Sequence, residues 1–161
     1  MTQKLQIRPA ARGDEGLVLA FVRELADYER ALDAVEATTA QLASVLFGAN
    51  PRAFCDIAEW DGAPAGFAMW FYNFSTWRGR HGIYLEDLFV KPALRGHGIG
   101  KALLVHLAKR AVGEGCGRFE WAVLNWNTPS IDFYKSLGAE PMSEWTGYRL
   151  SGAALEKLAS A

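Results

Sequence analysis

A glycine-rich turn in the middle of the chain carries three glycines at alternate positions, and it leads directly into a helical pattern. A turn of this kind collects unpaired backbone N–H groups next to the positive end of the helix dipole. Such a place suits an anion, most often a phosphate. The predicted phosphate site comprises Arg95, Gly96, His97, Gly98, Ile99, Gly100 and Lys101.

Two acids, Glu86 and Asp87, stand in the apolar strand expected just before this turn, over residues 83–90. Burial in that strand would raise the pKa of Glu86 toward the range in which a carboxylate accepts protons at neutral pH, so Glu86 is the candidate general base. Because side chains alternate along a strand, Asp87 is expected on the opposite face. The alternative for Glu86 is a plain ion pair with a nearby Arg or Lys.

Two familiar nucleotide motifs fit the turn poorly. A P-loop requires G-x-x-x-x-G-K-[ST], but Arg95 stands at its first glycine and Ala102 at its hydroxyl position. A dinucleotide fingerprint requires G-x-G-x-x-G, whereas this turn has G-x-G-x-G. A turn whose glycines serve geometry alone is the remaining alternative.

The bulk properties narrow the classes of protein. The net charge of −1 argues against nucleic acid as a partner, and no apolar run approaches the length of a membrane span. The N-terminus shows no signal peptide, and Cys55 and Cys116 lie far apart, so a reducing cytoplasm is expected. His81, His97 and His106 lack metal-ligand spacing, so no metal is expected.

The apolar patterns predict one α/β domain over residues 1–161 with a mixed sheet. Strands 54–60, 65–74 and 83–90 should form an antiparallel meander, with a hairpin at Asp61-Gly62 and a loop at 73–80. The strand at 118–124 follows a helix and should run parallel to 83–90. Thr38 and Gln41 form a capping box, and Thr128 should cap the following helix. The other predicted elements are a strand at 5–8, helices starting near Asp14, Thr38, Ile99, Thr128 and Ala153, and a strand at 145–150.

The chain resembles the GCN5-related N-acetyltransferases (GNAT), and within them the diamine (spermidine/spermine and thialysine) N-acetyltransferase group. The resemblance rests on the R-x-x-G-x-G/A match at residues 95–100 and on segments 23–29, 84–90 and 126–135. It implies the GNAT fold, with helices on both faces of the mixed sheet. It also implies acetyl-CoA as the cofactor, a small-molecule amine as the substrate, and a homodimer.

The resemblance also assigns roles to individual residues. Glu86 would help to deprotonate the amine, and Tyr134 would act as general acid toward the leaving thiolate, although periodicity alone favours a core aromatic at that position. Leu88, Phe89 and Val90 would hold the cofactor's amide arms through their backbone, with an N–H near Phe89 polarising the carbonyl. Asn127, Thr128, Pro129 and Ser130 would form a second cofactor contact or, alternatively, only a helix cap. The implied amine-binding residues are Tyr28, Glu29, Trp77, Glu86, Glu120, Trp121 and Ala122.

These features together predict direct acetyl transfer, within a ternary complex, to a small diamine, polyamine or thialysine-like amine. Residues 73–77 lack the acid that polyamine enzymes place there, which leaves room for a smaller amine or an amino acid. An amino acid, an amino-bearing antibiotic or a protein N-terminus is the alternative substrate. A non-catalytic acyl-CoA-binding regulatory module is the alternative of another class, and the presence of both Glu86 and Tyr134 argues against it.

Overall fold

The structure, a computed structural model, describes residues 4–161. The chain divides into two compact units, the first ending at Ala122 and the second beginning at Val123. The single-domain organisation expected from the length therefore stays a prediction. None of the helices within residues 4–161 has the length and apolar content needed to cross a bilayer.

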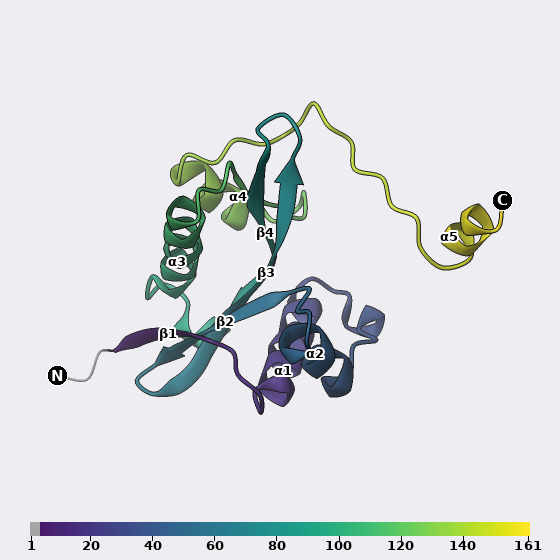
Figure 1. The fold of residues 1–161 in the computed structure, drawn as a ribbon. Helices are drawn as coiled ribbons and strands as arrows, with labels where there is room; N and C mark the ends of the chain where they lie inside the picture. Colours follow the sequence, from purple (N-terminus) through teal and green to yellow (C-terminus); the bar gives the residue numbers. More distant parts are fainter. Residues whose placement is uncertain (1–3) are drawn as a thin grey trace. The chain divides into compact units, whose positions relative to one another are not determined.

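A five-stranded mixed sheet forms the frame of the first unit (Figure 1), with the strands in the order β1-β2-β3-β4-β5. Its strands are β1 (Leu5–Pro9), β2 (Phe54–Trp60), β3 (Ala63–Ser75), β4 (Arg80–Val90) and β5 (Phe119–Trp121). The first four are antiparallel neighbours and β5 is parallel to β4, so the predicted meander and helical crossover are confirmed. The predicted Asp-Gly hairpin is also confirmed, because Asp61 and Gly62 take positive φ angles of 50° and 79° between β2 and β3.

The β3–β4 hairpin is longer than predicted. Asn73 pairs with Gly82 and Ser75 with Arg80, so only residues 76–79 form the turn. The loop expected over residues 73–80 is therefore too long. Polar residues are tolerated in these strands because this end of the ribbon is largely open to solvent, with Phe74 and His81 edge-to-face at 5.4 Å between ring centroids.

Helices cover both faces of the sheet (Figure 1). On one face lie α1 (Glu15–Tyr28) and α2 (Thr39–Phe47), where Phe21 stacks on Phe67 of β3 with ring centroids 5.4 Å apart. On the other face lies α3 (Ile99–Gly113), which buries Ile99, Leu103 and Leu107. Short 3-10 turns occur at η1 (Leu32–Ala34) and η2 (Pro92–Leu94).

The starts of the first two helices, α1 and α2, differ. The capping box of Thr38 and Gln41 is present at the start of α2. Asp14 occupies the N-cap of α1, but its side chain makes no capping bond. Its carboxylate instead accepts hydrogen bonds from the Arg8 guanidinium, at 2.7 and 3.1 Å, and from the Ala11 N–H at 2.8 Å. The acid thus ties the loop before α1 to β1.

The second unit contains α4 (Thr128–Ser136) and α5 (Gly152–Ala159). Asn127, and not the predicted Thr128, caps α4, because its side-chain oxygen accepts a hydrogen bond from the Ser130 N–H at 3.4 Å. The strand predicted at 145–150 is wrong, since these residues form neither helix nor strand. An extended segment becomes a strand only beside a hydrogen-bonding neighbour, which composition alone does not supply.

Candidate functional site

The glycine turn has the backbone that an anion site requires. Gly96 and Gly98 take left-handed conformations, with φ angles of 83° and 78°, and Gly98 is the N-cap of α3. A Cβ added at either glycine would meet nothing within 4 Å, so the backbone here lies open. The first N–H groups of α3 have no carbonyl partner inside the helix. The Ile99 side chain is buried, so that residue can offer only its backbone to a ligand.

Strand β4 presents one backbone edge beside this turn. Its pairing with β3 continues to the end, where Gly66 pairs with Val90. Its pairing with β5 covers only Ile83–Leu85. Beyond Leu85, no strand of the first unit's described residues pairs with that edge of β4. The backbone of residues 88–90 therefore has the edge that a ligand's amide groups need for strand-like hydrogen bonds.

A β-bulge occurs at Glu86. Asp87 pairs with Met69, while Leu85 pairs with Trp70, so Glu86 is the extra residue. Met69 lies in the core under α1, and Trp70, its neighbour in β3, faces the side of α3. Asp87 therefore lies on the α1 face, and Leu85 lies on the opposite one. Simple alternation, which assumed an uninterrupted strand, does not describe these acids.

The burial expected for Glu86 is wrong, because Glu86 is exposed and Asp87 is the partly buried acid. Loss of water contact raises the pKa of Asp87 to about 6, and the nearby charges of Glu86 and Glu29 add to this. Burial also raises the pKa of Glu29, which follows α1 directly. Three carboxylates thus share one region, and their mutual repulsion favours a cation there.

Arg95 joins the glycine turn to the end of α1. Its guanidinium carbon lies 4.8 Å from the ring centroid of Tyr28 and 5.8 Å from that of Phe89. Its Nε donates a hydrogen bond to the Val90 carbonyl at 3.1 Å. The structure thereby brings the predicted amine-side residues Tyr28 and Glu29 together with the predicted cofactor-side strand and turn.

The remaining turn residues point elsewhere. The His97 ring contacts the Trp60 ring edge-to-face, with centroids 5.1 Å apart, and its Nδ1 lies 3.2 Å from the Leu94 carbonyl. Lys101 is exposed on the first turn of α3.

Strand β5 divides the predicted amine-binding residues Glu120, Trp121 and Ala122. Glu120 pairs with Tyr84, whereas Trp121 pairs with Leu85. Neighbouring residues of a strand face opposite ways, so the side chains of Glu120 and Trp121 lie on opposite faces of the sheet. Ala122 is exposed at the end of the unit.

Trp77 lies far from the acids. It is 90% exposed in the turn of the β3–β4 hairpin. Asp87 pairs with Met69, and the six residues from there to Ser75 span about 20 Å of strand. Within residues 4–161 of one chain, Trp77 therefore does not lie with Glu86 and Glu29, the other amine-binding residues that the resemblance implies.

The second unit holds the other predicted residues. Tyr134 lies on α4 with its ring centroid 5.6 Å from that of Phe133. Thr128 and Pro129 lie in the first turn of α4, and the Asn127 side chain caps it by accepting a hydrogen bond from the Ser130 N–H. These four residues form a helix start, as the capping alternative expected, and a contact with a cofactor stays a prediction.

Sequence reasoning missed two charged residues, Asp87 and Arg118. Asp87 was expected opposite Glu86 and was given no role, because only strand pairing reveals the bulge that places it on the α1 face. Arg118 forms an ion pair with Glu120, and their spacing of two residues on a strand was a usable signal.

Comparisons with known proteins identify the family of this chain. Residues 18–139 match the acetyltransferase (GNAT) family. This chain belongs to the GNAT acetyltransferase family. It is 41% identical over 164 residues to a thialysine N-epsilon-acetyltransferase of Sus scrofa. The alignment covers 95% of this chain and 96% of that protein. The predicted family and its N-acetyltransferase activity are therefore confirmed.

Two further relatives of this GNAT protein differ in length and origin. It is 38% identical to spermidine/spermine N(1)-acetyltransferase-like protein 1 of Homo sapiens, over 90% of this chain but only 22% of that protein. An integron cassette protein from the mobile metagenome of V. cholerae has the same fold, with a TM-score of 0.82, 30% identity and 99% coverage of each chain. The predicted mixed α/β GNAT fold is therefore confirmed.

Proposed function

We propose that this N-acetyltransferase moves the acetyl group of acetyl-CoA directly to a primary amine of a small diamine, polyamine or thialysine-like molecule. The observation that carries the proposal is the group of three carboxylates, Glu29, Glu86 and Asp87, beside the open glycine turn. The names of the relatives, which act on thialysine or resemble spermidine/spermine enzymes, point to the same class of amine.

The residues of the first unit fit acetyl-CoA. Backbone N–H groups from Gly96 to Lys101 would take its pyrophosphate at the start of α3, and the edge of residues 88–90 would take its amide arms. Asn127–Ser130 is proposed as a further contact. Acetyl-CoA supplies the acetyl group as a thioester, and a backbone N–H near Phe89 would polarise its carbonyl.

The acid pair at the bulge would prepare the amine. A free alkylamine has a pKa of about 10.4, so it is almost fully protonated at neutral pH. Its positive charge suits the carboxylates of Glu29 and Asp87, and Tyr28 adds an aromatic face for the same cation. Glu86 is kept as the proposed base, and Asp87 joins it because a carboxyl with a pKa of about 6 accepts a proton readily near neutral pH. Tyr134 would donate a proton to the leaving thiolate.

A turnover assay tests this function. The purified protein receives acetyl-CoA and, in turn, putrescine, spermidine, thialysine, ornithine, an aminoglycoside or a peptide with a free N-terminus; thiol release and the mass of the product are recorded. We expect transfer to the small basic amines and intersecting lines in two-substrate kinetics, because both substrates bind before reaction. Acetyl-CoA binding without thiol release on any amine would instead support the non-catalytic module.

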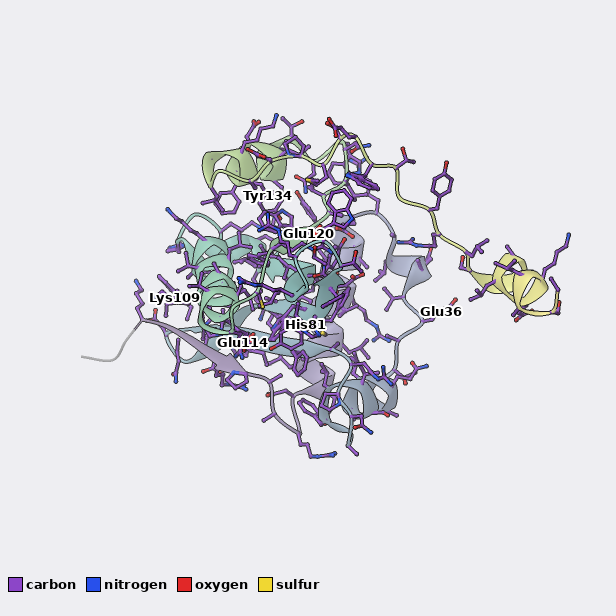
Figure 2. The ribbon with its side chains drawn as sticks, turned by 45° about the horizontal axis from the view of Figure 1, so that its top comes forward. Glu36, His81, Lys109, Glu114, Glu120 and Tyr134 are labelled. Atoms are coloured by element: carbon purple, nitrogen blue, oxygen red, sulfur yellow. The ribbon has the colours of Figure 1, made fainter. Side chains whose placement is uncertain are left out.

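Two variants separate the acids from general surface charge. Glu86→Gln and Asp87→Asn should each lower kcat roughly 100-fold or more at pH 7, with the dissociation constant of acetyl-CoA unchanged. Glu36→Gln is the matched control, since Glu36 is an exposed acid ahead of α2 (Figure 2) and should leave the rate unchanged. Full activity of both bulge variants would remove the acid pair from the mechanism.

We also propose a homodimer, as the resemblance implies, and a cytoplasmic location, as the two widely separated cysteines suggest. Trp77 is retained as an amine-binding residue only in such an assembly, because it lies far from the acids of its own chain. Sedimentation equilibrium tests the dimer, and cell fractionation with a specific antibody tests the compartment. A monomer at micromolar concentration would remove Trp77 from the site.

A further inference from the structure

A charged pair lies on the same face of the sheet as Asp87, farther along toward the hairpin turn. Asp87 pairs with Met69, and the next residues of β3 on that face are Phe71 and Asn73. Phe71 pairs with Tyr84, which in turn pairs with Glu120 of β5. Paired residues of neighbouring strands share a face, so Glu120 belongs to the surface that carries Asp87.

Three contacts hold the Arg118–Glu120 pair, two of them made by Arg118 and one by Asn73. Arg118 Nε forms an ion pair with Glu120 Oε1, and Arg118 Nη2 donates a hydrogen bond to the Phe74 carbonyl at 3.2 Å. Asn73 Nδ2 donates to the same Glu120 oxygen at 3.4 Å. A Cβ at position 82 would come within 2.8 Å of Arg118 Cγ and 2.4 Å of Asn73 Oδ1, so Gly82 leaves the space in which both side chains lie on the sheet. The positive and negative groups are thereby held in a set order.

Both charged groups remain open to a ligand. The side chains of Arg118 and Glu120 are 38% and 34% exposed. An exposed ion pair stabilises a fold by only about 0–1 kcal/mol, so stability alone gives little reason for this positioning. Arg118 Nη1 and Glu120 Oε2 take no part in the contacts above, and Asn73 Oδ1 is buried without a hydrogen-bond partner among residues 4–161. A group with both charges can add to each side of the pair.

The distance from the bulge suits a basic amino acid. Asp87 and Tyr84 pair with β3 residues that are two positions apart, and Glu120 lies one strand further across, next to Tyr84. The Cα atoms of Asp87 and Glu120 are therefore about 8 Å apart. A side chain of lysine length carries its terminal nitrogen roughly 6 Å from its α carbon. The Tyr84 ring lies beside Glu120 on this face, and the Phe71 ring lies next to it with its centroid 5.1 Å away; together they offer an apolar surface to the methylene chain.

We propose that Arg118 and Glu120 recognise the α-carboxylate and α-ammonium groups of a basic amino acid whose side-chain amine lies at the acid pair of the bulge. This inference rests on the proposed function, and it selects amino acids over polyamines. A second ammonium group of a polyamine would meet a glutamate already neutralised by an arginine. An α-amino acid satisfies both charges, and each new bond is charge-assisted.

The experiment compares each amino acid with the diamine that lacks only its carboxylate. The rates kcat/KM for lysine and cadaverine, and for ornithine and putrescine, are measured for wild type, Arg118→Gln, Arg118→Lys and Glu120→Gln. Arg52→Gln is the matched control, because Arg52 is exposed in the loop before β2. Lysine methyl ester and N-α-acetyl-lysine remove each charge from the substrate in turn.

Wild type should prefer the amino acid, and Arg118→Gln should lower that preference roughly 10- to 100-fold. The kcat/KM for lysine methyl ester, which lacks the free carboxylate, should be the same in Arg118→Gln as in wild type. Arg118→Lys should restore part of the preference for the amino acid. An acetyl-CoA affinity and a thermal unfolding midpoint equal to those of wild type establish that each variant is folded. A wild-type preference for diamines, or a preference unchanged by Arg118→Gln, would overturn the inference while acetyl transfer itself stood. If none of these amines is acetylated, the proposed function is overturned, and this inference with it.

Discussion

Replacing Asp87 by asparagine should make the folded protein more stable at neutral pH. Burial and the neighbouring acids raise the pKa of this carboxyl from 3.8 to about 6. A raised acid pKa means that protonation favours the folded state. The stabilisation of the folded state by the protonated carboxyl is complete below the unfolded pKa near 3.8, and it is lost as the pH rises through 6. At pH 7.5 the charged carboxylate therefore costs the folded state about 3 kcal/mol, since each pKa unit corresponds to about 1.4 kcal/mol.

Urea unfolding followed by tryptophan fluorescence measures this difference. Asp87→Asn should raise the free energy of unfolding by about 3 kcal/mol at pH 7.5, by about half of that at pH 5, and by very little near pH 4. Asp33→Asn is the control, because Asp33 is exposed in η1 and its replacement should change stability by less than about 0.5 kcal/mol. A loss of stability at pH 7.5, or a gain that does not depend on pH, would refute the reasoning.

The same substitution should lower activity. The proposed mechanism uses the Asp87 carboxylate to attract the amine and to accept its proton, so the variant should combine higher stability with roughly 100-fold lower kcat. Opposite changes in stability and rate distinguish a functional carboxylate from one that supports the fold. A stable variant with a normal rate would place the mechanism on Glu86 alone.

Three further substitutions test other parts of the molecule. Tyr134→Phe should lower kcat roughly 100-fold or more while acetyl-CoA affinity stays normal in calorimetry, and an unchanged rate would exclude the general acid role. Gly98→Val should abolish acetyl-CoA binding, because a β-branched residue strains the left-handed backbone and its side chain blocks close approach; Gly115→Val, at φ 68° beyond the other end of α3, should lose stability but keep affinity. Asp14→Asn should destabilise the fold by roughly 1–2 kcal/mol at pH 7, because Arg8 lowers the pKa of Asp14. That loss should vanish in urea titrations as the pH falls through the lowered pKa, and a loss independent of pH would contradict the ion-pair explanation.

The elements that local chemistry decides were predictable from the sequence. The Asp61-Gly62 turn needs two left-handed residues, and this dipeptide adopts that backbone at low cost. The capping box at Thr38 and the glycine start of α3 depend on residues within one helical turn of each other. Each of these features forms from neighbours in the chain.

Features set by strand pairing were not predictable in the same way. The faces of Glu86 and Asp87 depend on where β4 takes its extra residue against β3, and the distance of Trp77 depends on the length of that ribbon. The pattern at 145–150 had the composition of a strand, but these residues form neither helix nor strand, because composition does not supply the pairing that a strand needs. Residue types identified candidate chemistry, while pairing decided which candidates share a surface.

The bulge explains how one short segment serves two requirements that conflict. β4 must bury Leu85 on one face and Phe89 on the other, which fixes the apolar residues on both sides of the acids. An uninterrupted strand would place Asp87 on the face of Leu85, under α3, where a carboxylate would be costly and far from α1. One extra residue moves Asp87 to the α1 face, beside Glu29, and leaves Glu86 exposed at the same point. The pairing with β3 then resumes, so the backbone of residues 88–90 reaches the glycine turn in regular register. The acids that a cationic amine requires and the strand edge that an acyl donor requires thus follow from a single inserted residue.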